Sequence, residues 1–185
     1  TTTVSLKEEI ESLRKKSGAP GLVAGYFDET KLISWSSGVR KIGSDNAITA
    51  SDQFHLGSCT KSMTSVLIGQ LVDEGKVLWK STLGELFPDE PLLQDSAWQN
   101  TTIEELLEHR SGAPANCEWS KIHLANKADG VVQSRRKVLQ WLTLQERPSS
   151  PKYLYSNVGY ALLGHICESK WNEEWESSMQ SRIFK

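Results

Sequence analysis

The chain has 185 residues, of which 38% are hydrophobic and 24% are charged, and its formal net charge is −2. This composition excludes general disorder and indicates one packed domain, or a domain with part of another. The near-neutral charge argues against a nucleic-acid-binding protein, which usually carries a large basic excess. The apolar runs are too short to span a membrane.

Residues 1–48 are predicted to form an N-terminal helix followed by a β-hairpin. Ser5-Leu6-Lys7-Glu8 fits a capping box that opens a helix, and Gly18 is placed to end it. Two apolar, β-prone runs follow at 21–27 and 32–35, and the polar residues between them predict a hairpin turn. Two strands alone form a marginal sheet, so we expect the hairpin to need further strands.

Residues 49–185 are predicted to be mainly helical. The helix predicted at 58–74 has apolar residues around most of its circumference, so we expect it to be central and mostly buried. The helix predicted at 131–144 presents the basic run Arg135-Arg136-Lys137 to solvent. Further helices are predicted at 82–87, from 102 to about 111, at 157–168 and at 173–183. Together with the hairpin, these helices indicate a mixed α/β fold.

The cysteines and histidines do not indicate a metal site. Three cysteines form no C-x-x-C pair, and four histidines show no metal-ligand spacing. We therefore expect no structural zinc site. A Cys117–Cys167 disulfide stays open on spacing alone, although buried free thiols are the favoured interpretation. Cys59 is expected to pack on a helix face away from its neighbour Ser58.

Ser58-Cys59-Thr60-Lys61 is one of four S-x-x-K matches, the others beginning at Ser12, Ser134 and Ser149. Only Ser58 lies where a loop turns into a helix predicted to be buried. Residues i and i+3 share a helix face, so the Lys61 amine can reach the Ser58 hydroxyl. Partial desolvation favours a neutral amine that can accept the serine proton, and the helix N-terminus favours negative charge nearby. The sequence therefore predicts Ser58 as a nucleophile with Lys61 as its base.

Tyr155-Ser156-Asn157 is the one Y-x-N among the four tyrosines, and it lies at a predicted loop-to-helix junction. A tyrosine near Lys61 would have its phenolate favoured and could shuttle a proton to a leaving group. The Asn157 carboxamide can both donate and accept, which suits holding Lys61 and a substrate amide. The alternative is structural, with Tyr155 a half-buried aromatic and Asn157 a helix cap.

Both motifs belong to a set of four ordered blocks. The blocks are Phe54-His55-Leu56-Gly57-Ser58-Cys59-Thr60-Lys61-Ser62-Met63-Thr64, Leu71-Val72-Asp73-Glu74-Gly75-Lys76-Val77, Thr101-Thr102-Ile103-Glu104-Glu105-Leu106-Leu107-Glu108-His109-Arg110-Ser111-Gly112 and Tyr155-Ser156-Asn157-Val158-Gly159-Tyr160-Ala161-Leu162-Leu163-Gly164. A shorter segment, Gly18-Ala19-Pro20-Gly21, leads into a predicted strand. These segments resemble the β-lactamase-related serine hydrolases, a family that contains class C β-lactamases, D-Ala-D-Ala carboxypeptidases and esterases.

The resemblance implies a β-lactamase/transpeptidase-like fold, a helical region with an antiparallel sheet. It also implies acyl transfer through an acyl-serine that water then hydrolyses, with no metal or organic cofactor needed. Ser58 would be the acylated nucleophile and one backbone oxyanion donor, Lys61 its activating partner, and Tyr155 the general base and acid. Asn157 would contact the substrate. His109 is expected to be structural, fixing the turn at Ser111-Gly112.

The family's third motif, Lys/His-Thr/Ser-Gly, does not occur after Tyr155 in these residues, and Lys16-Ser17-Gly18 is interpreted as a chance match. We therefore expect residues 1–185 to be a partial β-lactamase-like domain, the N-terminal portion of a longer enzyme with the C-terminal sheet strands missing. On its own this portion is expected to be weakly active at best. It is also expected to need oligomerisation or strand exchange to cover its open edges.

The substrate implied is a small molecule or peptide, namely a β-lactam, a D-Ala-D-Ala peptide or an ester. One alternative within the family is a carboxylesterase or peptidase rather than a β-lactamase. Another, from a different class, is a truncated homologue that only binds. Localisation is unknown from the residues, and the resemblance implies a periplasmic or secreted protein.

Overall fold

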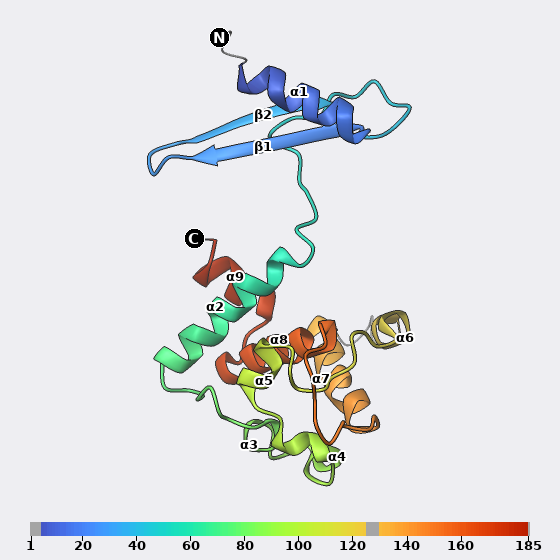
Figure 1. The fold of residues 1–185 in the computed structure, drawn as a ribbon. Coiled ribbons are helices and arrows are strands. Elements are labelled where there is room, and N and C mark those ends of the chain that lie inside the picture. Colours follow the sequence, from blue (N-terminus) through green and yellow to red (C-terminus); the bar gives the residue numbers. More distant parts are fainter. Residues whose placement is uncertain (1–4, 125–129, 185) are drawn as a thin grey trace. The chain divides into compact units, whose positions relative to one another are not determined.

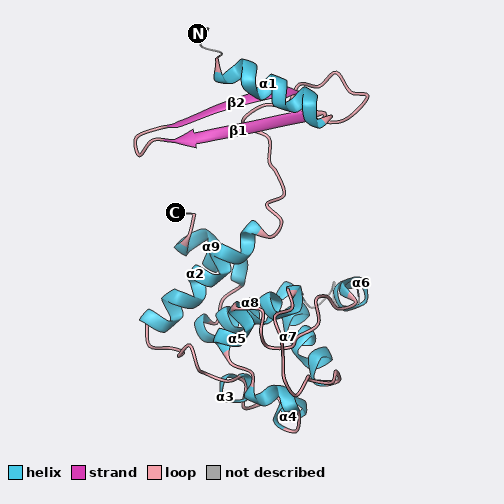
Figure 2. Ribbon diagram, in the orientation of Figure 1, coloured by secondary structure: helices cyan, strands magenta, loops and turns pink. Residues whose placement is uncertain are grey.

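The computed structural model describes residues 5–124 and 130–184, and side chains are described outside 123–132. The chain divides into two compact units, Thr1–His55 and Leu56–Lys185, which are described separately (Figure 1). The first unit combines a helix with a two-stranded antiparallel sheet, and the second is helical (Figure 2). The mixed α/β fold predicted from the sequence is confirmed.

The first unit contains α1 (Leu6–Ser17), β1 (Gly21–Phe27) and β2 (Leu32–Gly38). The capping box predicted at Ser5 is present, and Gly18 ends α1 in the left-handed conformation with φ 69°. The strands pair in register from Gly21 opposite Gly38 to Phe27 opposite Leu32. The hairpin prediction is therefore confirmed, but β2 continues three residues beyond the predicted end at 35.

Helix α1 packs on this hairpin through one partly buried arginine. The Arg14 guanidinium donates to Ser37 Oγ at 3.0 Å and to the Ala19 carbonyl at 3.2 Å, so it joins α1 to β2 and to the connection between α1 and β1. Ile10 is the buried apolar residue of α1. At the far end of the hairpin Phe27 and Leu32 are exposed. The described part of the first unit therefore has a small core.

The second unit is built from helices of very different lengths. The three long ones are α2 (Cys59–Asp73), α7 (Gly130–Thr143) and α8 (Asn157–Trp171). The shorter ones are α3 (Leu83–Leu86), α4 (Pro91–Gln94), the 3-10 helix η1 (Ala97–Asn100), α5 (Ile103–Leu107), α6 (Trp119–Leu124) and α9 (Trp175–Arg182). The sequence predicted all three long helices, but it did not predict α4, η1 or α6.

Helix α8 is the centre of the second unit. Helices α2, α5, α7 and α9 all contact it. Five of its apolar residues are fully buried, as expected for a helix whose sequence is apolar around most of its circumference. These residues are Val158, Leu162, Leu163, Ile166 and Cys167.

Helix α2 packs against α8 on one side only. Leu67, Ile68 and Leu71 are fully buried, whereas Val66 is 51% exposed. The prediction that α2 is mostly buried was therefore wrong in extent, because its apolar residues surround the helix while its contacts with α8 and α9 cover only part of it.

Arg135 was predicted to lie in solvent, and this was wrong. Its side chain is only 17% exposed and forms ion pairs with Glu168 on α8 and with Glu176 on α9. Arg135 lies on the face of α7 that packs against α8, and the Glu168 and Glu176 carboxylates neutralise its charge. Cys117 and Cys167 are free thiols, so the disulfide that spacing left open is not formed.

Candidate active site

Ser58 is the N-cap of α2, and Gly57 before it has φ 55°, which turns the chain into the helix. The Ser58 backbone is already helical, with φ −73° and ψ −7°, and its hydroxyl makes no capping bond to the helix. Many serines in this position cap the helix instead. The Ser58 hydroxyl is therefore available to side chains around it, and the first of these is Lys61, whose Nζ lies 3.4 Å from Ser58 Oγ.

Tyr155 and Asn157 come from the start of α8. The Tyr155 hydroxyl donates to Ser58 Oγ at 2.7 Å. Lys61 Nζ donates to Asn157 Oδ1 at 2.6 Å and lies 4.8 Å from the centre of the Tyr155 ring. The structure thus brings together all four residues that the sequence singled out, and they lie in one unit of the chain.

The site lies where the N-terminal turns of α2 and α8 meet. Ser58 is the N-cap of α2, and Ser156 is the N-cap of α8. Helix N-termini carry unpaired N–H groups and a partial positive charge, so negative charge is stabilised close to them. Two such termini, together with the Lys61 ammonium, make this an electropositive place for a hydroxyl to lose its proton.

The loop after α5 holds the start of α8 in position. The Asn157 N–H donates to the Ala115 carbonyl at 2.8 Å, and Asn157 Nδ2 donates to Asn116 Oδ1 at 2.8 Å. The Ser156 hydroxyl donates to the Pro114 carbonyl at 2.7 Å. With its N–H, its Nδ2 and its Oδ1 all engaged, Asn157 is fixed in orientation, and so is the Lys61 amine that it accepts from.

The electrostatics of the site favour the ionised form of Tyr155. Its hydrogen bonds with Lys61 and with Ser58 lower the pKa of the Tyr155 phenol, and the charge of Lys61 acts in the same direction. A phenol with a lowered pKa is a better proton acceptor at neutral pH than an ordinary tyrosine, because its phenolate is more populated. The arrangement can therefore move a proton between Ser58 and Tyr155 over one hydrogen bond.

Sequence reasoning missed Asn116 and the contribution of Tyr160. The Tyr160 hydroxyl bonds to the Leu107 carbonyl at 3.2 Å, and its ring centre lies 5.5 Å from Lys61 Nζ. Tyr160 is one turn after Asn157 on α8, so helical spacing from the Y-x-N motif could have found it. Asn116 lies in an irregular loop, where no periodicity marks it.

Cys59 was expected to be packed, but it is exposed. It is the first residue of α2, beside the nucleophile candidate Ser58, where few side chains surround the helix start. The expectation failed because the helix face on which Cys59 lies has no neighbour among the described residues of this unit that buries it.

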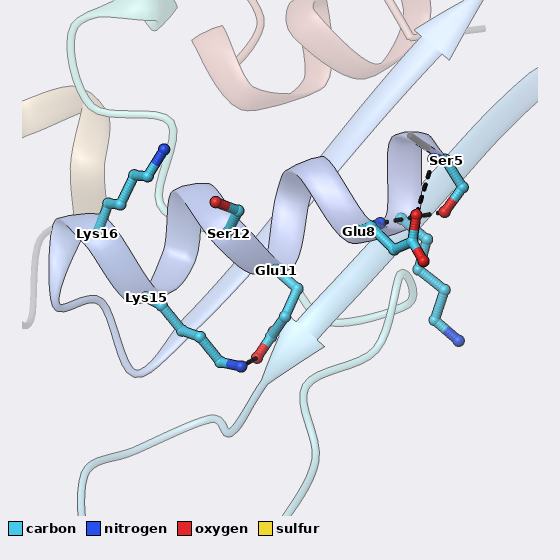
Figure 3. Close-up of a pocket in the computed structure, with 7 residues that line it drawn as sticks. Ser5, Glu8, Glu11, Ser12, Lys15 and Lys16 are labelled. Carbon is cyan, nitrogen blue, oxygen red and sulfur yellow. Dashed lines mark hydrogen bonds and ion pairs between the residues drawn. The ribbon is translucent and has the colours of Figure 1, made fainter. Parts of the chain in front are cut away.

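Other features of the described residues are less suited to chemistry. Within residues 5–124 and 130–184, no group of three His, Cys, Asp or Glu side chains is placed to hold a metal ion. None of the helices described is long and apolar enough to cross a membrane. A hollow runs along α1, but Figure 3 shows Glu8 bonded back to Ser5 and Lys15 paired with Glu11, so these groups are already engaged.

Comparison with known proteins identifies the class. In the comparison with protein families, residues 6–185 match the family described as Beta-lactamase. The chain therefore belongs to the β-lactamase family, a group of serine hydrolases. It is 27% identical to the unguisins hydrolase ungD of Aspergillus violaceofuscus over 96% of this chain and 32% of that protein. It is 26% identical to penicillin-binding protein 4 of Amycolatopsis lactamdurans over 96% of this chain and 45% of that protein.

The solved structures agree on the fold. The class C β-lactamase from Rhodobacter sphaeroides superposes with a TM-score of 0.72 and 21% identity, covering 95% of this chain and 46% of that one. At this identity the likeness establishes the β-lactamase/transpeptidase-like fold alone. The chain spans less than half the length of each of these three proteins.

Proposed function

We propose that Ser58 is the nucleophile of a serine hydrolase that acts through an acyl-serine intermediate. The observation that carries this proposal is the pair of contacts on one hydroxyl, Tyr155 at 2.7 Å and Lys61 at 3.4 Å from Ser58 Oγ. A serine hydroxyl is a weak nucleophile unless a neighbouring group takes its proton. Family membership supports the same chemistry.

In the proposed first step, Tyr155 reacts as its phenolate, the form that Lys61 favours. Ser58 Oγ attacks the substrate carbonyl carbon while this phenolate takes the hydroxyl proton. The Oγ–C bond forms, and the carbonyl oxygen becomes an oxyanion. When the oxyanion collapses, the C–N bond of an amide or lactam, or the C–O bond of an ester, breaks. Tyr155 returns the proton to the departing nitrogen or oxygen.

In the second step, water attacks the acyl-serine. The water proton passes to Tyr155 and then to Ser58 Oγ, so the products are a carboxylic acid and the original serine. Asn157 is proposed to hold the Lys61 amine through the 2.6 Å bond and to orient a substrate amide. The positive helix N-terminus at Ser58 would stabilise the oxyanion that forms between the two bond changes.

The proposed substrates are carbonyl compounds with a good leaving group, namely a β-lactam, a D-Ala-D-Ala peptide or an ester. The name of one relative supports a β-lactam substrate, since it is a penicillin-binding protein and penicillin is a β-lactam. An esterase uses the same nucleophile and the same proton-transfer groups, so it is the alternative within this mechanism.

The test is the intact mass of the protein, at the length its gene encodes, after incubation with a fluorescent penicillin or a fluorophosphonate. We expect one adduct that is lost in Ser58→Ala but kept in Ser62→Ala. Ser62 is a matched control because it is also exposed on α2, and its hydroxyl bonds to the Cys59 carbonyl at 2.7 Å. Reaction with penicillin indicates an amide or lactam substrate, and reaction with the fluorophosphonate alone indicates an ester. No adduct with either reagent would support the non-catalytic alternative.

A further inference from the structure

His109 holds both neighbours of Tyr155 in the chain. The Leu154 N–H donates to the His109 carbonyl at 2.8 Å, and the Ser156 N–H donates to His109 Nδ1 at 3.0 Å. The backbone of His109 is left-handed, with φ 58°, a conformation that costs energy for a residue with a side chain. The same residue thus fixes the backbone on each side of Tyr155, from a strained conformation outside any helix.

The imidazole of His109 also lies against tyrosine rings. Its centre is 4.5 Å from that of Tyr155, 5.1 Å from that of Tyr160 and 6.0 Å from that of Tyr153. The contact with Tyr155 places the ring beside the phenol that bonds to Ser58. His109 does not bond to Ser58 in any described contact, so its influence on the nucleophile passes through Tyr155.

The bond from the Ser156 N–H requires one protonation state of His109. Nδ1 can accept only when it carries no proton, so the ring must be neutral with its hydrogen on Nε2. The rings of Tyr153, Tyr155 and Tyr160 contact the imidazole, and the charge of Lys61 from α2 acts on it. In the chain beside His109, Glu108 and Arg110 pair with each other at 3.9 Å.

We propose that neutral His109 is a positioning residue that holds Tyr155 against Ser58, and that protonation of its Nδ1 releases this hold. A proton on Nδ1 would point at the Ser156 N–H, so two donors would face each other and the hydrogen bond between them would be lost. The Tyr155 segment would then lose one of the two bonds that it makes with His109, and it would still be held by Leu154 on that side and by the bonds of Ser156 and Asn157 to the loop after α5. This inference rests on the proposed function, because it concerns the residue that transfers the proton of Ser58.

The charge environment acts in the same direction as the geometry. Burial, followed by the positive charge of Lys61, lowers the pKa of His109 below its usual value of 6.5. The neutral form that accepts from Ser156 is therefore the main form at neutral pH. We expect protonation, and with it the loss of positioning, only in acid solution.

Two variants distinguish the effect of the Nδ1 acceptor from the effect of the left-handed backbone at position 109. His109→Asn and His109→Gly both tolerate a left-handed backbone, but only asparagine keeps an acceptor, which does not titrate, at the position of Nδ1. In the full-length protein we expect His109→Gly to slow acylation of Ser58 by about 10- to 100-fold at every pH, with little change in KM, because Tyr155 is displaced. His109→Asn is expected to recover much of this rate and to lose the decline in acid that the wild type shows.

A second measurement does not depend on activity. In NMR spectra of the wild type, the Ser156 and Tyr155 amide signals are expected to shift with the same midpoint as the His109 imidazole. Any one of three results would overturn the proposal. They are equal acylation rates for wild type and His109→Gly, an unchanged decline of the rate in acid for His109→Asn, and amide signals that do not shift when the His109 imidazole titrates. If Ser58 forms no adduct in the wild type, the proposed function fails, and the NMR titration still decides whether His109 releases the Tyr155 segment.

Discussion

The ion pair between Arg135 and Glu168 offers a sharp test of the packing around α8. The Glu168 side chain is 1% exposed and that of Arg135 is 17% exposed, so neither charge is well solvated. Replacing Arg135 with methionine keeps an apolar stem of similar length but leaves the carboxylate without its main partner. Breaking a buried pair in this way costs about 3–5 kcal/mol of unfolding free energy, because an uncompensated charge stays buried.

The assay is urea unfolding followed by tryptophan fluorescence, for which the chain has seven tryptophans. With a dependence of about 1–3 kcal/mol per molar urea, Arg135→Met should lower the midpoint by about 1 M or more. Lys121→Met is the control, because its pair with Glu118 leaves the two side chains 74% and 61% exposed. An exposed pair contributes about 0–1 kcal/mol.

The double variant Arg135→Met with Glu168→Leu refines this test. Removing both charges leaves no buried carboxylate, and apolar replacement of a buried pair is often neutral or stabilising. We therefore expect the double variant to be more stable than Arg135→Met alone. If Arg135→Met unfolds at the midpoint of the Lys121→Met control, the reasoning about burial of Glu168 is refuted.

Two further predictions concern a glycine and the three thiols. Gly112 has φ 83°, and an added Cβ would lie 2.9 Å from a proline ring, whereas Gly75 has φ 69° and nothing within 4 Å. Each Gly→Ala change should cost about 1–2 kcal/mol for the left-handed backbone. Crowding should cost about 1–3 kcal/mol more at Gly112 alone. Equal urea midpoints for Gly112→Ala and Gly75→Ala would therefore contradict the prediction of crowding. For the thiols, iodoacetamide at pH 8 should label exposed Cys59 in the native protein. Burial raises the pKa of Cys117 to about 11 and that of Cys167 to about 12, so both should react only after unfolding. Peptide mapping that finds either one labelled as fast as Cys59 would be the contrary result.

Local signals in the sequence were enough to predict the nucleophile region. Ser58 and Lys61 are one helical turn apart, so their proximity follows from helix geometry once α2 is recognised. The capping box at Ser5 is equally local, and it forms as predicted. The Y-x-N motif marked Tyr155 and Asn157, but their approach to Ser58 depends on the packing of α2 against α8 and was inferred from the resemblance.

The features that the sequence did not reveal depend on contacts between distant segments. Arg135 meets Glu168 across two helices, and a run of three basic residues gives no sign of which one will be buried. Asn116 reaches Asn157 from an irregular loop. His109 accepts hydrogen bonds through its carbonyl oxygen and through Nδ1, and its backbone is left-handed. These properties cannot be read from the sequence, where His109 falls inside the helix predicted from 102 to about 111.

The meeting of α2 and α8 has a consequence for how the protein can be assayed. Ser58 is the N-cap of α2 and Tyr155 immediately precedes Ser156, the N-cap of α8, while the buried sides of both helices are part of the core. A molecule in which the core has loosened therefore separates the two hydroxyls, even if its individual helices persist. Under the proposed function, the fraction of Ser58 that reacts with an acylating reagent would measure the fraction of intact molecules in a sample, including in a cell extract where spectroscopic signals cannot be assigned to one protein.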